Sequence, residues 1–162
     1  MKSAIAYYSY SGNTRKVSDV LAEYLFQKGG VEQIELVPLD ESESFLGQCR
    51  RAFSRTRAAL TPVTFDLAHF DIICFGTPVW AFGPAPAMNT YLDKCAGLEN
   101  KEIILFTTYG SGTGNERCLN YMQDLLRKKN ATRFSRFSVQ QHKVGNKEEI
   151  IDKINEVLRL AP

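Results

Sequence analysis

The stretch Ser9-Tyr10-Ser11-Gly12-Asn13-Thr14 decides the expected fold, because it joins two segments of different periodicity. Before it, the apolar residues 4–8 predict a buried strand, and after it residues 15–27 carry apolar side chains at helical spacing. A hydroxyl- and glycine-rich loop between a strand and a helix directs the unpaired N–H groups of the first helical turn to one point. The stretch therefore predicts an anion site, for which phosphate is the usual ligand. A turn in which serine and threonine only cap the helix is the alternative.

The loop contains no lysine, so it lacks the GxxxxGK[ST] pattern of nucleotide hydrolases. Hydroxyl groups and backbone amides would have to hold the phosphate. Such a site suits a phosphomonoester that is kept as a fixed handle, because phosphoryl transfer uses lysine, arginine or magnesium against the developing charge.

The rest of the chain alternates between predicted strands and helices. Further strands are expected at residues 33–37, 70–75, 102–106 and 134–139, and further helices from Pro86, after Asn115 and over residues 147–160. This order predicts an α/β fold with a doubly wound five-stranded parallel sheet in three α/β/α layers, as a single domain over residues 1–162. Strand 134–139 is the most polar and suits an edge.

Two later loops are rich in glycine, threonine and aromatic residues, and they follow the third and fourth strands at residues 76–84 and 107–115. Ligands of doubly wound sheets bind beyond the carboxyl ends of the strands. We therefore expect these two loops and the loop at residues 9–14 to meet around one ligand.

Composition limits the function. The net charge is +2 and no long apolar run is present, so neither a nucleic-acid binder nor a membrane span of about 18 apolar residues is indicated. The apolar run at residues 4–8 is shorter than the core of a signal peptide, and we expect a cytoplasmic protein. Cys74, Cys95 and Cys118 lie in apolar patterns and are expected in the core. No metal site and no catalytic constellation is predicted.

Residues 38–64 form the least regular segment, with a possible helix at 45–59. Its basic residues Arg50, Arg51, Arg55 and Arg57 suggest a solvated helix face or a docking surface. Cys49 and Arg55 have the Cys-x5-Arg spacing of phosphatases, which we interpret as chance, because no buried strand precedes it and no glycine lies between them.

Over nearly its whole length the chain resembles the flavodoxin family, in its short-chain branch. Residues 9–14 match the family's [ST]-x-[ST]-G-N-T phosphate loop, and residues 76–80 and 108–112 resemble its two flavin-flanking loops. The basic segment departs from the family, whose typical carriers are acidic.

The resemblance implies FMN as the cofactor. Its phosphate would contact the hydroxyls of Ser9, Ser11 and Thr14 and the amides of Gly12 and Asn13, and its ring would stack on Trp80 or Tyr109. Phe82 would be a third wall or a core residue. The full predicted cofactor site comprises Ser9, Tyr10, Ser11, Gly12, Asn13, Thr14, Thr77, Pro78, Val79, Trp80, Ala81, Phe82, Gly83, Thr108, Tyr109, Gly110, Ser111 and Gly112.

Two functions follow from this resemblance: an electron carrier between redox proteins, or an FMN-dependent NAD(P)H or quinone oxidoreductase with a small quinone-like acceptor. The chain shows no separate nicotinamide motif, which favours the carrier. Residues 76–92 and 107–115 contain no Asp or Glu, which favours the reductase, because a less acidic pocket disfavours the reduced, anionic flavin less. A flavin-free binding module on the same fold is a third reading.

Overall fold

The computed structural model describes residues 1–40, 46–47, 50–51, 54–110 and 112–159. Five parallel strands pair in the order β2-β1-β3-β5-β6. They are β1 (Lys2–Tyr7), β2 (Gly30–Glu35), β3 (Ile72–Trp80), β5 (Glu102–Tyr109) and β6 (Arg133–Gln140). A short strand, β4 (Gly83–Pro84), pairs antiparallel with the end of β3. The predicted doubly wound sheet is confirmed, with β6 at one edge and β4 as an addition.

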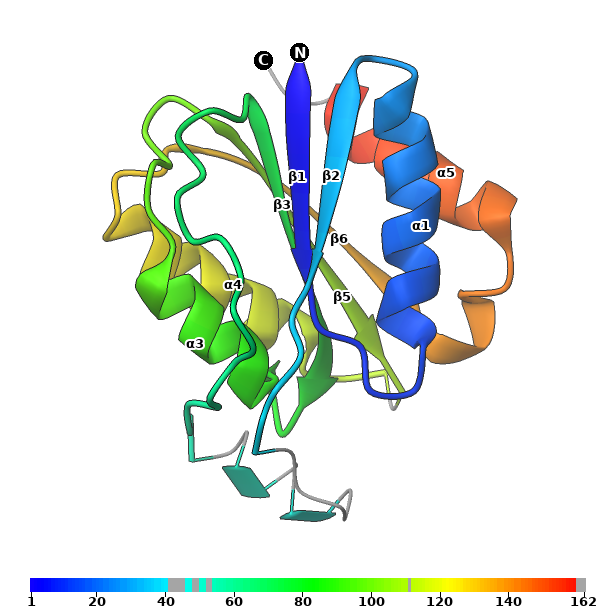
Figure 1. Ribbon diagram of the computed structural model, residues 1–162. Coiled ribbons are helices and arrows are strands. Elements are labelled where there is room, and N and C mark those ends of the chain that lie inside the picture. The colour runs from blue at the N-terminus through cyan, green and yellow to red at the C-terminus, as the bar shows by residue number, and fades with distance from the viewer. Residues whose placement is uncertain (41–45, 48–49, 52–53, 111, 160–162) are drawn as a thin grey trace.

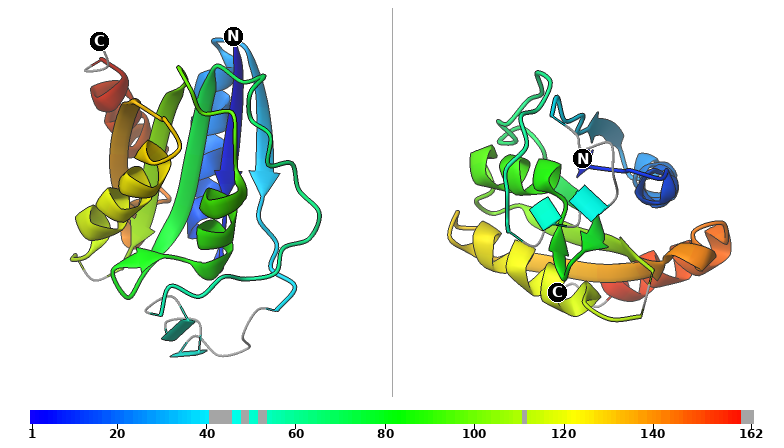
Figure 2. Two further views of the ribbon diagram at one scale, coloured as in Figure 1. Left: turned by 90° about the vertical axis from the view of Figure 1, so that its left-hand side faces the viewer. Right: turned by 90° about the horizontal axis from the view of Figure 1, so that it is seen from below.

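Helices cover both faces of the sheet (Figure 1). α1 (Asn13–Phe26) and α5 (Lys147–Arg159) lie on one face, and α3 (Pro86–Lys94) and α4 (Asn115–Arg127) lie on the other. Figure 2 shows the molecule from the side of α3 and α4 and from below. Among the described helices, none combines the length and the apolar character that a bilayer crossing needs.

The core is divided by the sheet because successive strand residues point to opposite faces. Ala4 and Ala6 of β1 face α3 and α4, whereas Ile5 and Tyr7 face α1 and α5. Leu21 of α1 is fully buried against the second face. A buried leucine of this kind contributes about 1.5–3 kcal/mol to folding.

Strand β3 continues beyond the predicted end at residue 75, and it runs to Trp80. Thr77 and Pro78 still pair with Thr107 and Thr108 of β5, which extends the ladder by tertiary contact. The pairing of β1 with β3 ends at Gly76, so Pro78, which has no N–H group, has a strand partner on one side only. Strand β2 begins earlier than predicted, because its residues from Gly30 onward pair with β1 from Lys2 onward.

The segment after β2 lies beyond the carboxyl ends of the strands (Figure 1) and then returns along α3. Residues 46–47 and 50–51 are helical, but residues 54–55 form a turn, so the helix expected at 45–59 is shorter than predicted; residues 45, 48–49 and 52–53 lie outside the described part. Arg51 pairs with Asp40, and Arg57 pairs with Asp93 of α3. The second pair attaches the segment to α3, while Arg50 and Arg57 are exposed, as expected for a solvated or docking surface.

Candidate functional site

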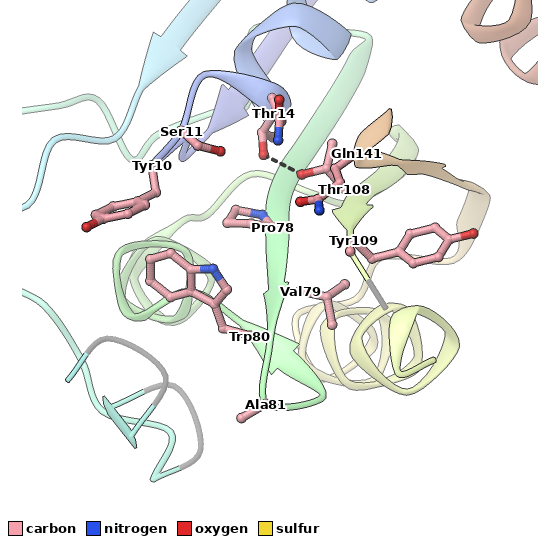
Figure 3. Close-up of a pocket in the computed structure, with 12 residues that line it drawn as sticks. Tyr10, Ser11, Thr14, Pro78, Val79, Trp80, Ala81, Thr108, Tyr109 and Gln141 are labelled. Carbon is pink, nitrogen blue, oxygen red and sulfur yellow. Dashed lines mark hydrogen bonds between the residues drawn. The ribbon is translucent and has the colours of Figure 1, made fainter. Parts of the chain in front are cut away.

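A cavity of about 510 Å³ opens at the carboxyl edge of the sheet (Figure 3). Its wall combines the first loop, the end of β3 with its turn, the end of β5, and one residue after β6. The lining residues are Tyr10, Ser11, Asn13, Thr14, Pro78, Val79, Trp80, Ala81, Thr108, Tyr109, Gly110 and Gln141. The three loops that were expected to share one ligand therefore do meet.

The first loop presents the start of α1 to this cavity. Gly12 has a left-handed backbone (φ 83°) at the N-cap, no side chain caps the helix there, and the first turn contains no acidic residue. The hydroxyl of Ser9 instead accepts a hydrogen bond from the Arg15 amide, at 3.2 Å. The N–H groups at the helix start are thus directed at the cavity, and the glycine allows the turn that directs them.

A buried hydrogen bond joins the first and third loops. The hydroxyl oxygens of Thr14 and Thr108 lie 2.8 Å apart (Figure 3), and both residues are at most 3% exposed. A hydroxyl has one proton and two acceptor positions, so this bond uses only one of the two protons. The second proton is available to a ligand oxygen in the cavity.

The second wall is a tight hairpin. Trp80 pairs with Gly83 across a two-residue turn, in which Ala81 (φ 47°) and Phe82 (φ 64°) both adopt left-handed backbone conformations. Each such residue other than glycine costs about 1–2 kcal/mol. Strain of this kind is concentrated at functional sites, and here it places Ala81 at the cavity wall.

Buried aromatic packing fixes the Trp80 ring. It lies edge to face with Tyr8 at 5.5 Å and with Tyr10 at 5.6 Å between ring centroids, and it is 5% exposed. Tyr10 is 42% exposed and offers the more accessible ring. Tyr109 lines the cavity through its base, while its ring points away from Trp80 (Figure 3).

Six residues of the predicted site do not line the cavity. Ser9 and Gly12 shape the first loop, and the buried Thr77 hydroxyl accepts a hydrogen bond from the Ala85 amide at 3.0 Å, at the base of the hairpin. The others are Phe82, Gly83 and Gly112, and Ser111 lies outside the described residues. Interpreting Phe82 as a core residue is wrong: the turn holds it outward, 45% exposed, near the Arg117 guanidinium.

Gln141 is the lining residue that sequence reasoning missed. It begins the short helix η1 (Gln141–Lys143), directly after the fifth parallel strand. Its side chain reaches Gly110, where an added Cβ would lie 3.3 Å from the amide nitrogen of Gln141. The available signal was its position after a parallel strand, at the edge where the other loops also open.

Among the described residues that line the cavity, none has a charged side chain. Two ion pairs involve residues close in sequence to the lining residues: Arg15 pairs with Glu35, and Lys143 pairs with Glu149 at 2.8 Å. The bond with Glu149 raises the pKa of Lys143, and the same bond lowers the pKa of Glu149. Among the described residues, no cluster of His, Cys, Asp or Glu could hold a metal ion.

FMN fits this chemistry. The cavity lies within the size range of cofactor pockets. One end offers hydroxyls and the start of a helix to a phosphate, and the other offers aromatic and aliphatic side chains to a flat ring.

Comparisons with known proteins agree with this geometry. The model of the NADPH-dependent FMN reductase family matches residues 5–143. A protein from Bacteroides uniformis is similar in structure, with a TM-score of 0.72, 21% identity, and 95% of this chain and 97% of that chain covered.

Two solved flavin proteins are also similar. A flavoprotein from Lactobacillus acidophilus in complex with FMN has a TM-score of 0.62 and 19% identity, with 91% of this chain and 98% of that chain covered. Oxidised flavodoxin 1 from Bacillus cereus has a TM-score of 0.62 and 17% identity, with 94% and 98% covered. At these identities the likeness shows the flavodoxin-like fold, while the family match covers most of the sequence. The chain belongs to the NADPH-dependent FMN reductase family, and FMN is its cofactor.

Proposed function

We propose that this protein is an FMN-dependent oxidoreductase that passes two electrons from NAD(P)H to a small quinone-like acceptor. The flavin supplies the redox chemistry when it is bound, and the chain supplies binding, orientation and electrostatics. The family match favours this function over a carrier.

In this proposal the first loop holds the phosphate of FMN. The Ser11 hydroxyl, the spare hydroxyl proton of the Thr14–Thr108 pair and the amides of Gly12 and Asn13 donate to its oxygens. Such bonds to an anion are about twice as strong as neutral ones. The loop therefore anchors the cofactor by a group that takes no part in the reaction.

The hairpin and the third loop orient the ring. Ala81 is held at the wall by the strained turn, so its backbone is fixed before a ligand arrives. Tyr10, Trp80 and Val79 exclude water from one side, and Gly110 allows close approach on the other. Trp80 is only 5% exposed, so it offers the flavin ring no more than an edge. Tyr10, which is more exposed, is therefore the main candidate for stacking on the flavin.

One structural observation carries the choice of a reductase: none of the described residues that line the cavity is charged. Hydride transfer leaves negative charge on the ring system, and neighbouring carboxylates would oppose that charge. A cavity wall without carboxylates therefore favours a flavin that accepts an electron pair from a nicotinamide.

An electron carrier between redox proteins is the second candidate. The observation that favours it is that two aromatic side chains at the cavity are exposed: Tyr10, which lines it, is 42% exposed, and Phe82, next to Ala81 in the turn, is 45% exposed. Apolar side chains clustered at a redox site are typical of a protein docking surface.

Kinetics distinguish the two functions. Purified protein loaded with FMN is mixed with NADPH under anaerobic conditions, and the yellow colour is followed. We expect bleaching on mixing, and catalytic NADPH oxidation when a quinone is added. Protein that keeps its colour with NADPH, but is bleached by a reduced redox protein, would establish the carrier instead.

A further inference from the structure

The guanidinium of Arg55 packs against the hairpin at the cavity wall. Its Nη1 atom lies where a Cβ on Gly83 would be, at 1.5 Å from the ideal position, so only glycine leaves room for it. Gly83 pairs with Trp80 at the cavity wall. The cation is therefore separated from the cavity by the thickness of one hairpin.

The guanidinium is enclosed on its other side by α4. It lies 4.1 Å from the ring centroid of Tyr121 and near the Cys118 thiol. Burial raises the pKa of Cys118, so that thiol is neutral at physiological pH, although the Arg55 charge acts in the opposite direction. On the side of α4, Arg55 thus contacts an aromatic ring and a neutral thiol.

No carboxylate balances this charge among the described residues. Arg51 pairs with Asp40 and Arg57 with Asp93, whereas Arg55 forms none of the ion pairs in that part of the chain. Its Nη1 atom is buried and has no hydrogen-bond partner. Its backbone also adopts a left-handed φ of 52°.

This arrangement of Arg55 costs free energy of folding, so a purely structural role does not explain it. A buried donor without an acceptor destabilises the fold, and an apolar side chain of similar length would fill the same space without that penalty. Unsatisfied buried groups in native proteins call for a functional explanation. The described lining residues carry no charge, so they offer little opposition to the field of an unpaired cation at the ring position.

We propose that Arg55 sets the reduction potential of the bound FMN by stabilising negative charge on the reduced ring through the β3–β4 hairpin. Arg55 acts at a distance and is a positioning and tuning residue, without touching the cofactor. The inference rests on the proposed function only in that FMN occupies the cavity, because it concerns the affinity of the site for two redox states and not the substrate.

The test is a reductive titration of the FMN-loaded protein in equilibrium with a reference dye. In Arg55→Met the midpoint potential should become more negative, with the ratio of reduced to oxidised FMN affinity falling roughly tenfold, as expected for one charge acting across a partly buried site. Arg55→Lys should keep most of the wild-type value. Arg57→Met removes one charge from the ion-paired neighbour of the same segment, and it should leave the potential unchanged.

Equal potentials in wild type and folded Arg55→Met would overturn the inference, as would an equal shift in Arg57→Met. Thermal unfolding reports whether each variant folds. If Arg55→Met does not fold, Gly83→Ala serves instead, because its methyl group displaces the guanidinium and should shift the potential in the same direction. A shift seen in a protein that does not oxidise NADPH would support the tuning role and refute the proposed reductase.

Discussion

Thr14→Val tests the phosphate loop and its link to the third loop in one substitution. The change removes the hydroxyl and keeps the shape, so the buried Thr108 hydroxyl loses its partner at 2.8 Å. An unsatisfied buried hydroxyl costs about 1–3 kcal/mol, and we expect the free energy of unfolding to fall by that amount. If the same hydroxyl pair donates to the phosphate, FMN loses one charge-assisted bond of about 1.5–3 kcal/mol, which corresponds to roughly 10–100-fold weaker binding.

Two assays separate these effects. Urea unfolding measures stability, and fluorescence titrations compare FMN with riboflavin, which lacks the phosphate. Riboflavin affinity should barely change in Thr14→Val. In the double variant with Thr108→Val no hydroxyl is left unpaired, so stability should recover while FMN binding stays weak. Equal losses for FMN and riboflavin would refute the assignment of the phosphate to this loop.

Two further predictions concern the buried core. Gly76→Ala places a Cβ 2.0 Å from the ring of Phe106, and it should cost about 1–3 kcal/mol in urea unfolding, with part of the loss recovered when Phe106→Leu is added; an unchanged stability would contradict the packing described. Burial raises the pKa of Cys95 from 9.0 to about 11. The unfolded chain then ionises first as pH rises, so this thiol removes about 2 kcal/mol of stability by about pH 10.5. Cys95→Ala should lose correspondingly less between pH 8 and pH 10.5, and an identical alkaline loss in both proteins would count against the shift.

Some features of the fold and of the site could be predicted from short stretches of the sequence. The [ST]-x-[ST]-G-N-T loop predicted the strand–helix turn, and the structure adds that Gly12 adopts a left-handed backbone there, which glycine permits without strain. The alternation of apolar runs and helical faces predicted the sheet. Those features depend mainly on residues that are close together in sequence, and the structure contains them.

Features set by tertiary contacts could not be predicted in the same way. The extension of β3 to Trp80 depends on pairing with β5 and β4, and the inward packing of Trp80 depends on Tyr8 and Tyr10. Phe82 is apolar, which suggested the core, but a strained turn directs it outward. Gln141 follows β6 and is more than 30 residues away in sequence from the third loop. No local pattern therefore marks it as a site residue.

The partners of the arginines at residues 50–57 also could not be predicted from the sequence. A run of basic residues indicates a charged surface, because sequence alone does not reveal which acids face it. The structure pairs Arg51 and Arg57 with carboxylates from outside their run, and it inserts Arg55 between the hairpin and α4. One residue of the run therefore lies directly behind the hairpin of the cavity wall.

The most direct test of the central claim uses the protein's single tryptophan, Trp80, which lines the cavity. Protein stripped of flavin is titrated with FMN while tryptophan fluorescence is followed. The account predicts quenching that saturates at one FMN per chain, with weaker binding of riboflavin. FMN that binds without changing the fluorescence of Trp80, or protein that stays colourless at saturating FMN, would contradict a single cofactor held where the three loops meet.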